Sequence, residues 1–275
     1  MRRQLALMGL VMGLAMGAPV MAQDTNPPPN CPVFQGEADG IRTSYYMGEG
    51  LAYFNAGQYN NAALSFSCIV RVIDDTYVPA YMSRASTYMR QRDYQRAMED
   101  YTRAIELDGE LIAAINNRGV VQAALQEYEA AAEDFDRAIE VDPDFIAAYN
   151  NRSILYALAG EYEQAITLLE DGIARSGIDR VLTQYRDPNR AADAPAIPFD
   201  PIHANAYALL GIMYSAQALE QYNDYLFLSN QQNGFFPDER IQSAAGALES
   251  RFNFEMRLDD GTWMLVARYD ATAGQ

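Results

Sequence analysis

The sequence offers few side chains for acid–base or covalent catalysis. Its 275 residues contain one histidine, His203, and its setting is typical of a surface residue at a helix start, not of a general base. The acidic pairs Glu99 with Asp100 and Glu133 with Asp134 are predicted to lie on solvated helix faces. Lysine is absent, which excludes Schiff-base and phosphate-loop lysine chemistry. We therefore predict no catalytic residues, no cofactor and no enzyme, with a hydrolase left as a remote alternative.

Two cysteines, Cys31 and Cys68, are the next reactive groups. If the protein is exported, they lie in a compartment where disulfides persist. A bridge between them would stabilise the fold by roughly 4 kcal/mol on the chain-entropy model. The alternative is two unrelated thiols. Together with a single histidine they are too few for a zinc site, so no metal is predicted.

The first 22 residues are typical of a secretory leader. Arg2 and Arg3 precede an apolar run over residues 5–20, and small residues lead to a cleavage point after Ala22. The alternative is a membrane anchor, but the apolar run contains Pro19 and is shorter than the ~20 residues that a span needs. We expect an exported protein, periplasmic or secreted, without membrane insertion after cleavage.

The charge of the chain restricts its partners. The net charge is −17, and loss of the leader with Arg2 and Arg3 would make it −19. A chain this acidic repels nucleic acid and anionic membrane surfaces. We therefore expect a protein or peptide partner and no nucleic acid.

One pattern recurs four times along the chain. Each copy has a tyrosine, an alanine three residues later, a small residue nine positions before the tyrosine and a bulky one four positions earlier still. The tyrosines are Tyr59, Tyr94, Tyr128 and Tyr162, at spacings of 35, 34 and 34 residues. Bulky positions recur at three- and four-residue spacing within each half of the unit, which predicts two amphipathic helices per copy.

This unit resembles the tetratricopeptide repeat (TPR), a 34-residue helix-turn-helix motif. The resemblance implies an all-α helix-turn-helix solenoid over residues 43–176, with four repeats and a partial fifth. Two departures are Gln122, where the other copies have tyrosine, and one extra residue near 75–77. The four repeats are predicted at about 43–77, 78–111, 112–145 and 146–176.

The remaining segments have their own characters. Residues 23–42 are an N-terminal extension, and 177–203 form a proline-rich loop. Residues 204–251 are predicted to be a degenerate repeat and capping helices. In 252–275, alternating apolar runs flank an Asp-Gly pair at 260–261, which predicts a small C-terminal β-hairpin and tail. Its apolar face is expected to pack on the last helices as a cap.

The resemblance also implies a binding surface. In such repeats the first helix of each unit lines a concave groove that takes up extended peptides or helices. Asn117 and Asn151 occupy equivalent positions there, and Asn116 and Asn150 each precede them by one residue. Asparagine has donors and acceptors that can bind a peptide backbone without reading its sequence. The alternative is that these asparagines satisfy each other or water between the helices.

The other predicted groove residues are mostly apolar, which suits an apolar peptide or a helix face. They are Asn55, Met82, Met89, Arg90, Val120 and Ile154. The resulting hypothesis is a protein- or peptide-binding adaptor or scaffold of the cell envelope. The alternative is a structural or self-associating module of a larger envelope complex.

Overall fold

The computed structural model describes residues 30–32, 36–177, 205–214, 216–217, 253–259 and 261–268. The expected leader, most of the expected loop at 177–203 and His203 lie outside these residues. The helices and strands of the described part are α1 (Asp39–Asn55), α2 (Tyr59–Cys68), the π-helical turn η1 (Ile69–Ile73), α3 (Val78–Arg90), α4 (Tyr94–Leu107), α5 (Ile112–Ala124), α6 (Tyr128–Val141), α7 (Ile146–Leu158), α8 (Tyr162–Ser176), β1 (Asn253–Asp259) and β2 (Thr262–Arg268).

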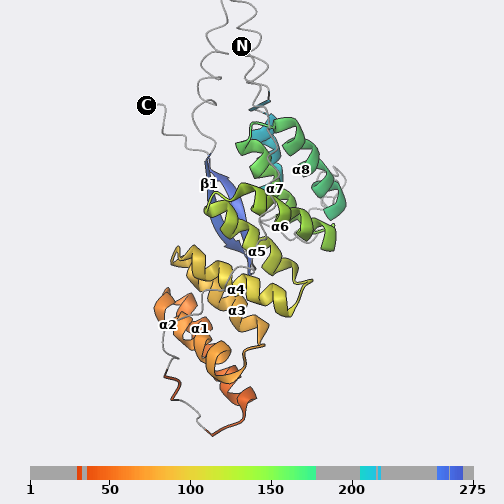
Figure 1. Cartoon of the computed structure of the whole chain (residues 1–275). Helices are drawn as coiled ribbons and strands as arrows, with labels where there is room; N and C mark the ends of the chain where they lie inside the picture. Colours follow the sequence, from red (N-terminus) through yellow and green to blue (C-terminus); the bar gives the residue numbers. More distant parts are fainter. Residues whose placement is uncertain are drawn as a thin grey trace, which may run out of the picture.

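The helices form the expected all-α solenoid. Each first helix packs on the second helix of its own repeat, and that helix packs on the first helix of the next repeat (Figure 1). Residues 205–214 form a further helical segment whose Ala206 and Leu209 are buried against the fourth repeat. This segment is the partial fifth repeat. None of the described helices has the length and apolar character needed to cross a membrane.

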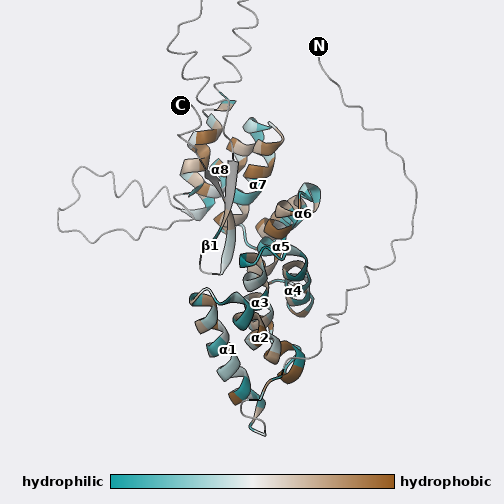
Figure 2. Ribbon diagram, turned by 90° about the vertical axis from the view of Figure 1, so that its left-hand side faces the viewer, coloured by the Kyte–Doolittle hydropathy of each residue, from teal (hydrophilic) through white to brown (hydrophobic). Residues whose placement is uncertain are grey.

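The recurring small and large residues explain the packing within each repeat. Bands of hydrophobic and hydrophilic residues alternate along the helices (Figure 2). At Gly119 an added Cβ would lie 2.7 Å from the ring of Phe135, so the ring occupies the space that a side chain would need. The alanines and large residues of the repeat pattern are fully buried; they are Ala62, Ala97, Ala131, Ala165, Phe66, Tyr101, Phe135 and Leu169.

The extra residue of the first repeat lies earlier in the chain than the spacing suggested. Asp74 follows η1 directly, just as Asp108 and Asp142 follow the second helices of the next two repeats. The added residue is therefore absorbed in the π-helical turn and not near 75–77. A π-helical turn closes its hydrogen bonds over five residues and not four, so it can hold one more residue than an α-helical turn.

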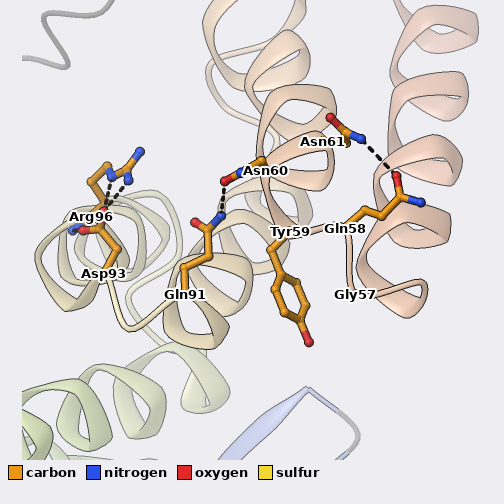
Figure 3. Close-up of a pocket in the computed structure, with 8 residues that line it drawn as sticks. All are labelled: Gly57, Gln58, Tyr59, Asn60, Asn61, Gln91, Asp93 and Arg96. Carbon is orange, nitrogen blue, oxygen red and sulfur yellow. Dashed lines mark hydrogen bonds and ion pairs between the residues drawn. The ribbon is translucent and has the colours of Figure 1, made fainter.

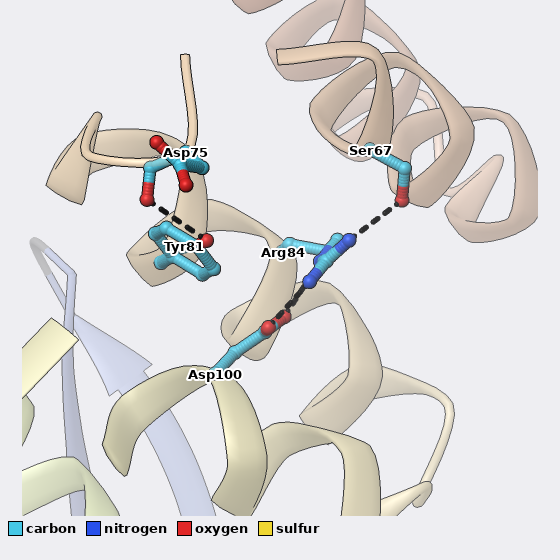
Figure 4. A network of polar contacts seen from close by, with 5 residues as sticks. All are labelled: Ser67, Asp75, Tyr81, Arg84 and Asp100. Atoms are coloured by element: carbon cyan, nitrogen blue, oxygen red, sulfur yellow. Dashed lines mark hydrogen bonds and ion pairs between the residues drawn. The ribbon is translucent and has the colours of Figure 1, made fainter. Parts of the chain in front are cut away.

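Buried ion pairs hold the two helices of the middle repeats together. Arg84 of α3 binds Asp100 of α4 at 2.6 and 2.7 Å and also donates to Ser67 at 2.9 Å (Figure 4). Arg118 and Asp134 form the same two-bond pair one repeat later. Burial is the largest single influence on Arg84 and opposes its charge, but the hydrogen bonds to Asp100 and the negative charge of that carboxylate together raise the pKa of the guanidinium.

These pairs correct the expectation of solvated acidic faces. Asp100 and Asp134 are 4% and 5% exposed. The other member of each acidic pair is more accessible: Glu99 is half-buried and Glu133 is exposed. Each buried aspartate lies sixteen residues after its arginine, a separation that joins the two helices of one repeat. The 34-residue recurrence of Arg84 with Asp100 and of Arg118 with Asp134 was a signal present in the sequence.

A disulfide ties the N-terminal extension to the first repeat. Cys31 and Cys68 are bonded, with their Cα atoms 5.7 Å apart. Both are buried, and they belong to an apolar cluster that also contains Tyr46 and Ile69. The bridge therefore attaches residue 31 to the end of α2.

The two strands form the predicted hairpin. They are antiparallel, with Asp259 opposite Thr262 and Met256 opposite Leu265. Gly261 has a φ of 78°, the left-handed conformation that the favoured two-residue hairpin turns require. The Asp-Gly signal in the sequence therefore located the turn correctly.

The position of the hairpin differs from the expected cap. β2 lies along α5 and α7, the first helices of the third and fourth repeats (Figure 1). Trp263 and Leu265 are almost fully buried there, in one cluster with apolar residues of the helices. The hairpin runs along the face of the first helices because that face offers apolar residues together with hydrogen-bonding partners for the strand backbone.

Candidate functional site

The candidate site is the face of α5 and α7 that contacts β2, called the groove below. The 34-residue repeat places Asn116 and Asn117 on α5 and Asn150 and Asn151 on α7, and all four are fully buried. Fully buried asparagines need hydrogen-bond partners, because a buried carboxamide without them loses its bonds to water and gains none in return. For Asn116, Asn117 and Asn151, these partners come chiefly from the backbone of β2.

Asn117 and Asn151 bind β2 in the same way, two strand residues apart. The Oδ1 of Asn117 accepts from the Trp263 amide at 2.7 Å, and its Nδ2 donates to the Gly261 carbonyl at 2.8 Å. The Oδ1 of Asn151 accepts from the Leu265 amide at 2.7 Å, and its Nδ2 lies 3.3 Å from the Trp263 carbonyl. Each carboxamide thus joins the carbonyl of one strand residue to the amide of the residue two positions later.

Asn116 links these two contacts. Its Nδ2 donates to the Trp263 carbonyl at 2.9 Å and to Asn117 at 3.2 Å. Its Oδ1 accepts from Asn151 at 2.8 Å. The sequence left two alternatives for these asparagines, binding of a peptide backbone or binding of one another. In the structure they do both. We call Asn116, Asn117 and Asn151 the asparagine cluster.

The asparagine cluster occupies the place of a third strand. Successive residues of a strand direct their amides and carbonyls to opposite edges. Trp263 and Leu265 direct theirs to the asparagines, so Thr262 and Met264 direct theirs to β1. Residues two apart in a strand are separated by about 6.6 Å along it. The solenoid repeat places the carboxamides of Asn117 and Asn151 so that each meets one of two such residues, Trp263 and Leu265. The groove therefore binds a strand by its outer edge.

One more asparagine, outside the asparagine cluster, binds the same edge of β2. Asn205, in the helical segment 205–214, donates to the Leu265 carbonyl at 3.3 Å and is 9% exposed. Sequence reasoning missed it because residue 205 does not stand in the register of Asn117 and Asn151. No periodic signal could have found it.

The other predicted groove residues lie in three environments. Met89, Val120 and Ile154 are buried in one apolar cluster with Trp263 and Leu265, and Met82 packs against that cluster. The guanidinium carbon of Arg90 lies 5.2 Å from the centre of the Trp263 ring, within cation–π range. Asn55 is exposed at the end of α1.

A pocket opens beside the seated hairpin. It has a volume of about 560 Å³. Met89 and Arg90 of α3, Tyr128 of α6 and Met256 and Trp263 of the hairpin are among its lining residues. The groove is therefore not completely filled next to β2.

A second pocket lies away from the groove, at the turns between the helices of the first two repeats (Figure 3). Its volume is about 660 Å³. Its polar groups bind one another: Gln91 donates to Asn60 at 2.6 Å, Asn61 donates to Gln58 at 3.0 Å, and Arg96 pairs with Asp93. Because these groups are already satisfied locally, this pocket is a weaker candidate.

The electrostatics of the described residues do not favour acid–base chemistry. Burial raises the pKa of Tyr101, which lies beneath the hairpin, and hydrogen bonds from Thr76 lower the pKa of Asp74. Both shifts move the groups away from neutrality, whereas a general acid or base needs a pKa near it. No group of three or more potential metal ligands occurs in the described part of the chain. What this arrangement can do is bind polypeptide backbone.

Comparison with known proteins identifies the repeat. Two family models described as tetratricopeptide repeat match residues 85–150 and 135–167. Protein unc-45 homolog B of Xenopus laevis is 33% identical over 72 residues, which are 26% of this chain and 8% of that protein. The chain thus spans a small part of the length of this curated relative.

One solved structure has a similar fold. The crystal structure of the MamA protein has a TM-score of 0.50 and 20% identity, and the match covers 72% of this chain and all of that one. The first TPR of Spaghetti (RPAP3), solved bound to the HSP90 peptide SRMEEVD, has a TM-score of 0.42 and 28% identity over 44% of this chain and 97% of that one. The two matching family models and the stacked helix pairs show that residues 85–167 of this chain are tetratricopeptide repeats.

Proposed function

We propose that this protein is a protein- or peptide-binding scaffold of the cell envelope that acts through the groove of α5 and α7. The observation that carries the proposal is the set of bonds from Asn117 and Asn151 to the backbone of β2. These bonds use only main-chain atoms of the strand, so the same carboxamides can hold any extended segment whose side chains fit. The groove is thus equipped to bind polypeptide, and no catalytic role is needed to explain its residues.

Two features support a location in the cell envelope. Residues 1–22 have the charge and apolar pattern of a secretory leader. Cys31 and Cys68 are disulfide-bonded, and structural disulfides persist in oxidising compartments outside the cytosol. Export would bring the groove into contact with envelope proteins.

One observation favours a second candidate function. Trp263, Met264 and Leu265 are buried as deeply as the helix core. A hairpin fixed permanently in that position would make the chain a structural module of an envelope complex, with no free groove. The two candidates differ in whether the groove exchanges its occupant.

Affinity capture from an envelope extract tests the proposed function. The immobilised chain, whose intact mass should lack residues 1–22, is compared with the double variant Asn117→Ala, Asn151→Ala. Loss of several backbone hydrogen bonds, each worth roughly 1 kcal/mol, should reduce recovery of the specific partner by about tenfold or more. The matched control is Asn60→Ala, Asn61→Ala, two exposed asparagines outside the groove, which should leave recovery unchanged. Equal recovery by all three proteins would reject the groove as the binding surface.

A further inference from the structure

The hairpin has the properties of a bound ligand. One edge of β2 contacts the solenoid through the backbone of alternate residues, from Gly261 to Leu265. Between Gly261 and Leu265, the side chains of Trp263 and Leu265 are buried in the apolar cluster of the groove. In sequence the hairpin begins more than 75 residues after α8, the second helix of the fourth repeat, so it is distant in the chain from the helices α5 and α7 that it contacts.

An isolated two-stranded hairpin is at best marginally stable in water. The outer edge of β2 would also present unpaired amides and carbonyls, the groups through which strands pair with other chains. The asparagine cluster satisfies those groups. Much of the order of the hairpin therefore depends on the groove, and a strand supplied from elsewhere would make the same main-chain bonds.

We propose that the C-terminal hairpin is an intramolecular occupant of the groove, and that the partner is an extended segment that takes the place of β2. This inference rests on the proposed function and specifies the chemistry of the partner. The segment carries an aromatic residue and, two positions later, an aliphatic residue, as Trp263 and Leu265 do. The backbone of this segment binds Asn117 and Asn151 as the edge of β2 does. Because the asparagines contact only backbone atoms, they do not select the side chain between the aromatic and the aliphatic residue.

Tethering makes the hairpin a strong competitor. A covalently linked segment acts at an effective concentration that reaches the millimolar range for short flexible connections. A free peptide with the same contacts therefore binds the wild-type chain weakly, because only the small fraction of molecules whose hairpin has left the groove can bind it. Weakening the hairpin without altering the groove should raise the apparent affinity for such a peptide.

The test uses the full chain and a fluorescent peptide with the sequence of residues 261–268. In the variant Trp263→Ala, Leu265→Ala the hairpin loses the two side chains that it buries in the apolar cluster of the groove, while the groove residues are unchanged. Fluorescence anisotropy should show that the peptide binds this variant on the order of tenfold more tightly than the wild-type chain. Adding Asn117→Ala and Asn151→Ala to the variant should abolish the gain. A control peptide with serine at the Trp263 and Leu265 positions lacks both apolar side chains and should bind weakly to all forms.

A second variant guards against misfolding of the first. Gly261→Val strains the turn, whose φ of 78° is disfavoured for a branched residue, and it leaves Trp263 in place. Trp263 is the only tryptophan of the chain and is 3% exposed, so its fluorescence reports directly on the hairpin. Release should shift its emission to longer wavelength while the helical circular dichroism is retained, and peptide affinity should rise as in the first variant.

The outcomes separate this inference from the proposed function. Equal peptide affinity for wild type and both variants, or a gain that survives loss of Asn117 and Asn151, would overturn the exchange of occupants. If capture from the envelope extract still depended on these asparagines, the scaffold function would stand with a different partner chemistry. If neither capture nor peptide binding depended on them, the groove would have no binding role.

Discussion

Replacing Asp100 with alanine is expected to lower the free energy of unfolding by about 3 kcal/mol, in the range measured when one partner of a buried ion pair is removed. Asp100 and Arg84 are 4% and 7% exposed and share two hydrogen bonds of 2.6 and 2.7 Å. The variant leaves the guanidinium buried, with a hydrogen bond to Ser67 but without its charged partner. Because the pair joins α3 to α4, the loss should appear as reduced cooperativity and a lower midpoint of urea unfolding.

The chain provides a matched control for this prediction. Asp136 pairs with Arg152 at 2.9 Å, but its side chain is 54% exposed. Exposed pairs contribute roughly 0–1 kcal/mol, so Asp136→Ala should change the unfolding midpoint little. Urea denaturation followed by circular dichroism compares the two variants directly. Equal effects of Asp100→Ala and Asp136→Ala would contradict a structural role for the buried pair.

The second large effect concerns the disulfide. The variant Cys31→Ala, Cys68→Ala should lose about 4 kcal/mol of stability, because the bridge joins residues 37 apart in sequence and restricts the unfolded chain. A reductant should destabilise the wild-type protein by a similar amount and should not affect the variant. Urea unfolding with and without reductant measures both. Identical curves for wild type and variant under oxidising conditions would show that the bridge does not contribute to the stability of the fold.

Much of the solenoid could be predicted because its information is local and repeated. The bulky and small positions recur within each helix, so the buried rings of Phe66 and Phe135 followed from their register. The hairpin followed from the Asp-Gly turn between alternating runs. The asparagines were selected by their equivalent positions in two repeats, and the structure places Asn117 and Asn151 in one site.

What covers the groove could not be predicted from the sequence. The asparagines and the residues of β2 that they bind are 112 to 147 residues apart, and no periodicity connects them. A strand edge accepts any group with the geometry of a peptide bond, so the sequence of β2 does not name its partner. Physical reasoning did require a partner for that edge, because a lone hairpin is marginally stable, but it pointed to the end of the solenoid.

The buried charges were misjudged for a related reason. A helix-surface aspartate is usually solvated, and Asp100 and Asp134 resemble that common case when each is considered alone. Their partners Arg84 and Arg118 lie on the preceding helix, so only the 34-residue recurrence of both residue types reveals the pairs. Asn205 had no such recurrence.

Hydrogen exchange at the Trp263 and Leu265 amides most directly tests whether the asparagine cluster holds the hairpin. These two amides face away from β1 and donate to Asn117 and Asn151, so in a free hairpin they would be open to water. In the wild-type chain they should exchange on the order of a hundredfold more slowly than in an unstructured peptide. In Asn117→Ala, Asn151→Ala that protection should disappear, while the amides of α3 and α4 keep theirs. Rapid exchange at Trp263 and Leu265 in the wild-type chain, or protection unchanged in the variant, would contradict the seating of β2 on the asparagines.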